Sequence, residues 1–466
     1  MNNLYQNNKS LLKILGITGL STLVATMGSV WFGRYVIKRS VNNVARTLLT
    51  EPYDRNLMEF ASAAARVGMQ NIVENSLRAE KGKVIHRPLG SPRKFIHFED
   101  LVFNVAQLQR MPTEEGINVD ISVVIGPKSK KPLNLAIPII ISAMSFGTAL
   151  SKKAKIAIAK GAAKAGTASN TGEAGMLPEE REVAKYLILQ FPRGHWSREL
   201  KVLKQADMIE IPIGQGASAG TSHMIKAKDL GSKSRKIMGL IKGQDTVIEA
   251  RLPELQRGWT MDEVVKYLKE VTGGIPVGIK LAGGKYLEQD IELALKANVD
   301  FITLSGGQGG SSGGPPILQD DFGLPTLITL CRGVKFLEKC NMKGKISLII
   351  DGSLFNPGQL LKAIALGANA VAIGTSALFA VTHNQALQAM PYEPPTQVTW
   401  YKGLYSKQFN VEMGANNLYK YLCSCAGEIV EGIKALGKKS LMEVNKDDLI
   451  ALTPEIAKIT GVELAY

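Results

Sequence analysis

The chain has 466 residues, of which 45% are hydrophobic and 21% are charged, and its 56 basic and 41 acidic residues leave a net charge of +15. This is the balance of a globular protein with one large domain and additional segments, and the charge is compatible with nucleic acid, an acidic membrane surface or anionic substrates. Because the basic residues are spread along the chain without an Arg-rich run or a zinc-finger spacing, we expect no nucleic-acid partner.

The N-terminal region contains an apolar segment of the length of a membrane span. Residues 14–32 read ILGITGLSTLVATMGSVWF and carry no charge, and about 20 such residues cross a ~30 Å hydrocarbon core as a helix. A secretory signal would have a shorter apolar stretch, and a buried soluble helix would have a polar face. Because Arg34, Lys38, Arg39 and Arg46 follow the segment, we predict a single-pass anchor over residues 1–40 in the cell membrane, with the catalytic domain in the cytoplasm.

The cysteines match neither a disulfide scaffold nor a zinc site. They are too few and too irregularly spaced for either, at Cys331, Cys340, Cys423 and Cys425. We interpret them as buried free thiols in a reducing compartment, and we expect no bound metal.

Residues 41–135 predict a helical and irregular lead-in segment. Apolar residues recur at helical spacing over about residues 40–80. The stretch HRPLGSPRKF then interrupts this pattern with Pro and Gly near residue 90. We expect helices before this break and a compact domain after it.

A repeated alternation of short apolar runs and helical stretches predicts a (β/α)8 TIM barrel, an α/β fold, over residues 136–380. Runs that are apolar at nearly every position suit parallel strands buried on both faces. Eight such units over roughly 245 residues favour a closed barrel over an open doubly wound sheet. Residues 381–466 predict a C-terminal helical extension. The eight runs are 137–145, 166–170, 186–191, 208–214, 277–282, 300–306, 346–352 and 370–375.

The Gly-rich stretch LSGGQGGSSGGPP, residues 304–316, directly follows the sixth run. A flexible linker is one interpretation, but two more strand–helix units follow, so we expect a loop at the carboxyl end of a strand, where barrel active sites are assembled. Glycine lets the backbone approach a planar or phosphorylated ligand closely. The loops after the seventh and eighth runs, residues 351–353 and 374–375, are where such barrels commonly hold phosphate. Asp351 would bind a ribityl or ribose hydroxyl there, or cap a turn.

Charged residues next to the predicted strands are candidates for the site. Lys280 stands alone in the apolar run VGIKLAGG, and a buried lysine is costly unless an anion pairs with it, so it lies beside an anion or reaches the surface at the strand's end. Arg193 follows the third run and could hold a carboxylate with both ends of its guanidinium fork. His195 and His223 follow the third and fourth runs, where they could donate protons or bind substrate, or serve no such role.

Several stretches in chain order resemble the FMN-binding domain of glutamate synthase, in its short, single-domain members. The resemblance covers about residues 95–380. It rests on AMSFGTALSKKAKIAIAKGAAKAGTASNTGEAGM, LILQFPRGHW, IEIPIGQGASAG, VGIKLAGG, LSGGQGGSSGGPP, IDGSL and ALGANAVAIGTSAL.

The resemblance implies FMN as the cofactor and assigns roles by position. Lys280 would lie near N1 and O2 of the flavin and stabilise the negative charge of the reduced ring. The implied catalytic residues are Lys280, Gln190 and Glu173. The implied cofactor-binding residues are Ala143, Met144, Ser145, Asn170, Gln190, Lys280, Gly309, Gly310, Asp351, Gly352, Ser353, Gly374 and Thr375, with Thr171 lining the site. The implied substrate-binding residues are Arg193, Gln215, Ser218, His223 and Gln308.

Three features depart from the family's pattern. The region after the eighth run reads FAVTHNQALQAMPYEPPTQV and contains no cysteine, so we expect no iron–sulfur cluster. The N-terminus holds the apolar segment where the full-length enzymes have a glutaminase domain. Ser218 stands where the family's QGAKPG motif has lysine, and Gln308 replaces an acidic residue of the Gly-rich loop, which leaves the substrate open.

The resemblance implies an FMN-dependent oxidoreductase acting on CH–NH2 donors in glutamate biosynthesis. Reduced flavin would pass a hydride to the imine formed from a 2-oxo acid and ammonia, with 2-oxoglutarate giving glutamate. Electrons would come from a pyridine nucleotide or from a membrane-associated donor protein. The alternatives are another FMN-dependent barrel enzyme acting on a small anion, such as a 2-hydroxyacid oxidase-like enzyme or an isomerase, and a catalytically inactive membrane-bound scaffold.

Overall fold

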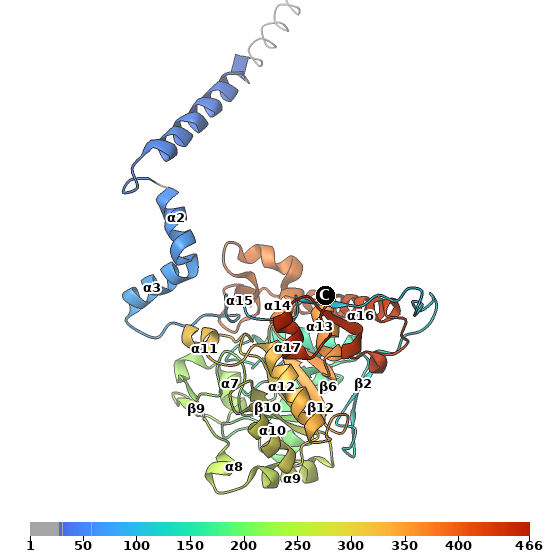
Figure 1. Ribbon diagram of the computed structural model, residues 1–466. Helices are drawn as coiled ribbons and strands as arrows, with labels where there is room; N and C mark the ends of the chain where they lie inside the picture. The colour runs from blue at the N-terminus through green and yellow to red at the C-terminus, as the bar shows by residue number, and fades with distance from the viewer. Residues whose placement is uncertain (1–27, 30, 57) are drawn as a thin grey trace, which may run out of the picture. The chain divides into compact units, whose positions relative to one another are not determined.

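The computed structural model describes residues 28–29, 31–56 and 58–466, and the chain divides into two compact units, Met1–Ile85 and His86–Tyr466 (Figure 1). In the first unit, helix covers residues 31–50, and α2 (Met58–Val67) and α3 (Met69–Lys81) follow. Gly68 separates α2 from α3 with a φ of +85°, a value that glycine adopts without steric cost.

The predicted membrane span, residues 14–32, lies almost entirely outside the described residues. Within the part of the chain that the structure describes, no helix is both long enough and apolar enough to cross a bilayer. The anchor therefore stays a prediction from sequence.

Eight parallel strands form a barrel in the second unit (Figure 1). Their order around the sheet is β4-β13-β12-β11-β10-β7-β6-β5, so that each strand lies beside the strands that precede and follow it in the barrel sequence. They are β4 (Ile139–Ile141), β5 (Ala168–Asn170), β6 (Tyr186–Gln190), β7 (Met208–Pro212), β10 (Val277–Ala282), β11 (Phe301–Ser305), β12 (Ser347–Asp351) and β13 (Ala370–Ile373).

The two end strands of this sheet, β4 and β5, meet and nearly close the barrel. The backbone N–H of Ala136 donates to the carbonyl of Gly166 over 3.0 Å, and the Thr167 hydroxyl donates to the carbonyl of Ile139. An open doubly wound sheet would leave its edge strands apart. The prediction of an eight-stranded parallel barrel is therefore confirmed.

The strands are buried because helices cover the outside of the barrel and side chains fill its inside. Every residue of β7, β11 and β12 is buried. A helix follows each strand before the next one begins. These helices are α4 (Lys152–Lys164), α5 (Pro178–Val183), α6 (Leu200–Leu203), α9 (Met261–Thr272), α10 (Leu287–Lys296), α12 (Thr326–Lys339), α13 (Pro357–Ala365) and α14 (Thr375–Thr382).

Segments before and after the barrel pair with each other. Strand β1 (Leu101–Phe103) runs antiparallel to β14 (Leu449–Ala451), next to α17 (Pro454–Thr460). The hairpin of β2 (Val123–Ile125) and β3 (Leu133–Leu135) lies at the amino ends of the barrel strands, where the Gly126 N–H donates to the Ser347 hydroxyl over 3.0 Å. After α15 (Pro394–Thr399), the long helix α16 (Val411–Ala435) packs on α4. A Cβ on Gly161 of α4 would lie only 2.8 Å from the Ala415 carbonyl oxygen of α16.

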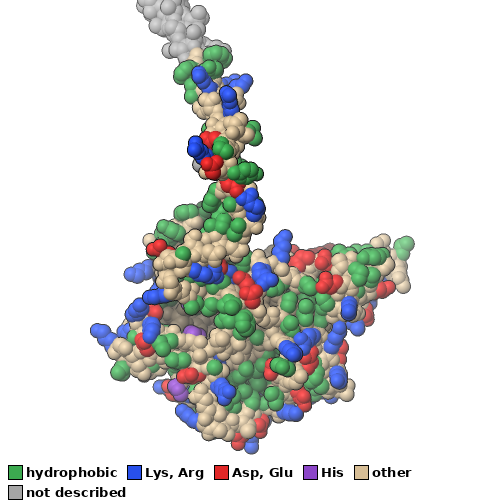
Figure 2. All heavy atoms as spheres, turned by 60° about the vertical axis from the view of Figure 1, so that its left-hand side comes forward, with side chains coloured by type: hydrophobic (Ala, Val, Ile, Leu, Met, Phe, Trp, Pro, Cys, Tyr) green, Lys and Arg blue, Asp and Glu red, His purple; other side chains and the backbone are tan. Residues whose placement is uncertain are grey.

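The basic side chains of the second unit are dispersed over the face that Figure 2 shows. Lys and Arg lie there among acidic, apolar and other side chains rather than in one continuous strip. Many are also neutralised by ion pairs, such as Lys226 with Asp245 and Arg332 with Glu288. This distribution agrees with the expectation from the sequence that the positive charge is spread.

A buried ion pair joins α4 to α5 beneath the loops that follow β4 and β5. Lys155 Nζ lies 2.8 Å from Glu180 Oε1, and both side chains are almost fully buried. The same ammonium donates to the carbonyls of Met144 and Asn170, each over 2.7 Å. Burial raises the pKa of Glu180, and the charge of Lys155 offsets this only in part. Lys155 therefore holds two loop backbones and one carboxylate at the same time.

We expect Lys155→Met to destabilise the fold by about 3–5 kcal/mol, because it leaves the Glu180 carboxylate buried without a counter-charge. Since the pKa of Glu180 is raised in the folded protein, the folded state binds a proton more readily than the unfolded chain. The destabilisation caused by Lys155→Met therefore becomes smaller as the pH falls and the Glu180 carboxylate is protonated. Guanidinium unfolding at two pH values measures both effects. Lys152→Met, on the same helix, serves as the control with at most about 1 kcal/mol, because its half-buried partner Glu179 keeps Lys233 as a counter-charge.

Candidate functional site

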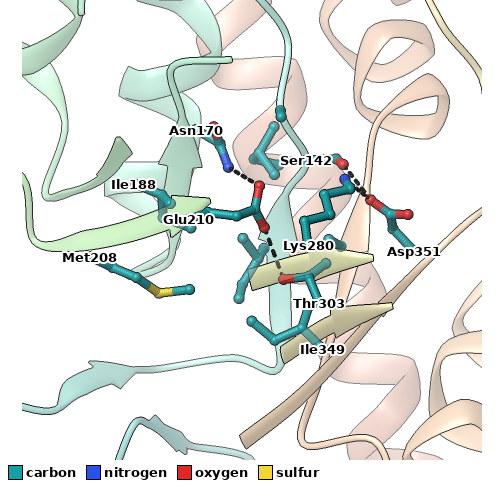
Figure 3. A pocket seen from close by; sticks show the side chains of 13 residues that line it. Ser142, Asn170, Ile188, Met208, Glu210, Lys280, Thr303, Ile349 and Asp351 are labelled. Atoms are coloured by element: carbon teal, nitrogen blue, oxygen red, sulfur yellow. Dashed lines mark hydrogen bonds and ion pairs between the residues drawn. The ribbon is translucent and has the colours of Figure 1, made fainter. Parts of the chain in front are cut away.

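A pocket lies inside the barrel toward the carboxyl ends of the strands (Figure 3). All eight strands, or the residues directly after them, contribute to its walls, and the polar side chains among them point toward one another. The lining residues are Ile140, Ile141, Ser142, Ala143, Asn170, Ile188, Met208, Glu210, Lys280, Thr303, Ile349, Asp351 and Ala372.

Lys280 is the fourth residue of β10 and has the anionic partner that a buried lysine requires. Its side chain is 3% exposed and forms an ion pair with Asp351, the last residue of β12 (Figure 3). The Ser142 hydroxyl donates to the same carboxylate oxygen over 2.9 Å. Burial by itself would lower the pKa of Lys280, but the charges of Asp351 and Glu210 more than offset this, so its pKa is raised and the ammonium stays charged.

Glu210 on β7 is a central acceptor of the pocket that the sequence analysis missed. Its carboxylate accepts hydrogen bonds from the Asn170 amide at 3.2 Å, the Gln190 amide at 3.0 Å and the Thr303 hydroxyl at 2.8 Å. The signal was present: Glu210 is the one charged residue of the apolar run MIEIPIG, as Lys280 is of its own run. A charged residue inside a strand that is buried on both faces must have partners.

Glu173 and Arg193 form a second buried pair, in the loops after β5 and β6. The guanidinium donates through Nε and Nη2 to the two carboxylate oxygens, each over 2.9 Å, and through Nη1 to the Gly220 carbonyl over 2.7 Å. All three nitrogen atoms of the Arg193 guanidinium are therefore engaged within the protein. The sequence analysis suggested that the Arg193 guanidinium binds a substrate carboxylate, but in the structure it binds the carboxylate of Glu173.

The two loop histidines are both exposed. His223 begins the short strand β8 (His223–Ile225), where the charges of Glu173 and Arg193 act on it. Partial desolvation lowers its pKa, with Glu173 acting in the opposite direction and Arg193 in the same one. His223 is therefore placed to respond to a change at the Glu173–Arg193 pair.

A small second core covers the loops after β5 and β6. The insertion between β7 and α9 contains β8, α7 (Ser232–Ile237), β9 (Thr246–Ile248) and α8 (Pro253–Gln256). Its apolar residues, Ile225, Leu230, Met238 and Ile248, pack with Ala174 and Trp196 of those loops. The Trp196 indole also donates to the Glu173 carbonyl over 2.7 Å. The insertion thereby fixes the backbone that carries the Glu173–Arg193 pair.

Glycines let the loops after β7, β11 and β12 approach one another closely. A Cβ on Gly216 would lie 2.2 Å from the Gly306 carbonyl oxygen, and one on Gly352 would lie 2.5 Å from Thr326 Oγ1. Gly352 also has a φ of +124°, which an L side chain would strain. A Cβ on Gly309 would lie at ordinary contact distance from the Cα atoms of both Gly216 and Gly352. We refer to Gly216, Gly306, Gly309 and Gly352 as the glycine cradle.

The Gly-rich loop is also held from outside the barrel. Arg87 and Gly314 exchange two backbone hydrogen bonds, of 2.9 and 3.1 Å. A Cβ on Gly310 would lie 2.8 Å from the Leu89 carbonyl oxygen and 3.1 Å from Thr375 Oγ1, at the start of α14. The loop lies between two strand–helix units and is fixed on both sides, so the linker interpretation is excluded. The short helix α11 (Pro316–Asp320) follows it.

The other residues singled out in the sequence lie in loops around the pocket. Gln308 is buried, and its side-chain oxygen accepts from the Thr326 N–H over 2.8 Å, so this group is tied to α12 rather than directed at a substrate. The Ser353 hydroxyl donates to the Gln308 carbonyl over 2.6 Å. Gln215 and Ser218 are half-buried in the turn after β7. The loop after β4 contains Ala143, Met144 and Ser145, and Gly374 and Thr375 begin α14.

Known proteins share most of this chain. Residues 91–439 match the conserved region in glutamate synthase. A glutamate synthase large subunit-like protein of Rhizobium meliloti (strain 1021) is 33% identical over 398 residues, which are 81% of this chain and 90% of that protein. An archaeal-type glutamate synthase (NADPH) of Dehalococcoides mccartyi is 26% identical over 83% of this chain and 82% of that protein. Among solved structures, a mutant flavocytochrome b2 with benzoylformate has a TM-score of 0.49 and 19% identity, over 78% of this chain and 80% of that chain.

We expect Glu210→Leu to destabilise the fold strongly, because the amide donors of Asn170 and Gln190 lose their acceptor inside the barrel. Each unpaired donor lowers the free energy of unfolding by about 1–3 kcal/mol. Glu210→Gln keeps a side-chain oxygen for these amides, and its new N–H group can donate to the Thr303 hydroxyl, so its cost is smaller. The midpoint of guanidinium unfolding measures the difference between the two variants. Equal stability of both variants would show that Glu210 does not organise the pocket.

Proposed function

Because the chain belongs to the glutamate synthase family, we propose that it is an FMN-dependent oxidoreductase that forms an amino acid from a 2-oxo acid and ammonia, with 2-oxoglutarate giving glutamate. The observation that carries this proposal is the buried, charged Lys280 at the carboxyl ends of the barrel strands. Its partner Asp351 directly precedes Gly352 of the glycine cradle. A buried cation thus lies next to a turn of bare backbone at the carboxyl ends of the strands, an arrangement that suits a phosphorylated redox cofactor.

The residues present fit FMN. The glycine cradle lets the loops after β7, β11 and β12 pack directly on one another, since a Cβ at Gly216 or Gly352 would clash with neighbouring atoms. The phosphate would be held by the N–H groups of Gly352 and Ser353, and by Gly374 and Thr375 at the start of α14, where the helix terminus favours an anion. Asp351 would accept from the ribityl hydroxyls. The loop of Ala143, Met144 and Ser145 would lie against the ring.

Bound FMN would supply hydride transfer, and the chain would supply the surroundings that direct it. Lys280 would provide fixed positive charge where negative charge develops on reduction. Glu210 fixes the amide groups of Asn170 and Gln190, whose N–H donors it binds, so that both side chains have one orientation toward the ring. Glu173 would act through Arg193, because both of its carboxylate oxygens bind that guanidinium.

The proposal includes the partners that this chemistry needs. Substrates would be a 2-oxo acid and ammonia, and electrons would come from a pyridine nucleotide or a donor protein at the membrane. The apolar segment at residues 14–32 supports a tether to the cell membrane, with the barrel in the cytoplasm. The sequence after β13 supports a site without an iron–sulfur cluster, since residues 379–398 contain no cysteine.

One observation favours a second candidate, an FMN-dependent enzyme acting on a smaller anion. The second carboxylate of 2-oxoglutarate needs a cation, yet Arg193 is engaged by Glu173, and residue 218 is serine where the family motif has lysine. Anaerobic titration of the purified protein separates the two candidates. Reoxidation of the reduced protein by 2-oxoglutarate plus ammonia supports the first candidate. Bleaching of the oxidised protein by 2-hydroxy acids supports the second. A protein that does not bind FMN contradicts both.

We expect Gly310→Ala to weaken FMN binding by at least about tenfold, or ~1.4 kcal/mol. The added Cβ would meet the Leu89 carbonyl and Thr375 Oγ1 and push the Gly-rich loop away from the start of α14. Titration of flavin fluorescence measures the dissociation constant. Gly313→Ala in the same loop is the matched control, because its Cβ would meet only an ordinary contact of 3.7 Å with His86. Equal affinities of the two variants would show that the close approach of Gly310 to Leu89 and Thr375 does not matter for FMN binding.

We expect Lys280→Ala to lower the reduction potential of the bound flavin and to weaken its binding, because the variant removes the charge that favours the reduced ring. Potentiometric titration in the presence of a reference dye measures the potential. Unchanged potential and unchanged affinity would together remove the role that we assign to Lys280.

A further inference from the structure

His97 is a buried histidine in the segment before β1 whose ring has no hydrogen-bond partner. Its side chain is 10% exposed. Neither ring nitrogen makes a hydrogen bond with any group in the described part of the chain. The nearest carboxylate oxygen that faces it, Glu99 Oε2, is 3.6 Å from Nδ1. Buried polar groups are nearly always paired, so an unpaired imidazole indicates a partner supplied in another state of the site.

The position of the His97 ring is fixed by its neighbours. The ring packs edge-on against the fully buried Phe98, with the ring centroids 4.9 Å apart. The Phe98 carbonyl accepts from Lys362 Nζ over 3.0 Å, and Glu99 accepts from the Gln359 amide over 2.7 Å. Both donors belong to α13. The segment that carries His97 is therefore attached to the helix that follows β12.

The ring faces the turn between β12 and α13. The carbonyl groups of Gly352 and Ser353 lie close enough to raise the pKa of His97, although neither forms a hydrogen bond with it. Both turn residues have positive φ, +124° for Gly352 and +56° for Ser353. For serine this conformation is strained and persists only where the surroundings hold it. Gln359 contributes to this support from α13, because its side-chain oxygen accepts from the Phe355 N–H over 2.8 Å.

We propose that His97 is a positioning residue for the phosphate-binding turn Gly352–Ser353. When FMN binds, a ring N–H of His97, which has no hydrogen-bond partner among the described residues, would donate to a carbonyl of this turn and thereby direct the turn's own N–H groups toward the phosphate of the cofactor. The inference rests on the proposed function, since it assigns to His97 the phosphate end of the FMN site. His97 lies 42 residues before Ile139, the start of the first barrel strand, and reaches the site only through the fold.

The charges around His97 make this role dependent on pH. Burial lowers its pKa most, Lys362 on α13 lowers it further, and Glu99 together with the two carbonyls raises it, with a lowered pKa as the result. The ring is therefore neutral near pH 7, with one N–H to donate. Protonation in mildly acidic solution adds a second N–H and a positive charge beside the turn. We expect FMN binding to gain from this protonation.

Comparison of FMN with riboflavin tests the inference, because riboflavin has the same ring and chain without the phosphate. The variants are His97→Phe, which keeps the edge contact with Phe98, and His97→Gln, which keeps an N–H donor and cannot titrate. Dissociation constants are measured by flavin fluorescence between about pH 5 and pH 8, because histidine titrates within this range. We expect His97→Phe to weaken FMN binding roughly five- to tenfold, about the net contribution of one hydrogen bond between neutral groups, and to leave riboflavin binding almost unchanged.

The remaining outcomes separate the inference from the proposed function. His97→Gln should retain most of the FMN affinity at pH 8 but should not show the increase in FMN affinity that the wild type shows on acidification. Glu99→Gln should move this increase to lower pH, because Glu99 raises the pKa of His97. An unchanged ratio of FMN to riboflavin affinity in His97→Phe, or the same pH profile in His97→Gln as in the wild type, would overturn the inference alone. A wild-type protein that binds neither flavin would overturn the proposed function and the inference with it. Binding of riboflavin by each variant reports that it has folded.

Discussion

The structure depends on charge neutralisation inside the barrel. Lys280 on β10 is buried at a cost that only nearby anions can offset, and Asp351 on β12 and Glu210 on β7 supply them. These side chains come from strands that lie close together in the sheet, with β7 beside β10 and β12 next but one to it. The ion pair and the Glu210 hydrogen bonds both lie inside the nearly closed barrel, where each buried charge needs the other groups as partners.

The outer part of the site follows from the same geometry. Once the carboxyl ends of the strands are drawn together, the loops after them have little room, and glycine at positions 216 and 352 permits an approach that a Cβ would prevent. Segments outside the barrel complete this end of the molecule. Arg87 pairs with the Gly-rich loop, Trp400 pairs with Leu150 after β4, and His97 faces the turn after β12. Parts of the lead-in from Arg87 onward and of the C-terminal extension thus hold loops that surround the site.

Residue chemistry and local pattern identified some members of the site and missed others for a physical reason. Lys280 was found because a lone charge in an apolar run must be paired, and Glu210 has the same signal in its own run. Arg193 was interpreted as a free carboxylate ligand, because a sequence does not show that Glu173 lies opposite its fork. His97 has no pattern around it, since its importance lies in a turn about 255 residues further along the chain.

The sequence by itself determined the eight strands, their order and the ends at which the site forms. The reason is that the local pattern of apolar and polar residues indicates which segments are buried strands and which are the helices between them. It also carried the motifs that place the chain in the glutamate synthase family. Only the tertiary structure decided which charges neutralise one another, which glycines are sterically required and which distant segments hold the loops. These are contacts between residues far apart in the chain, and their partners become defined only when the barrel closes.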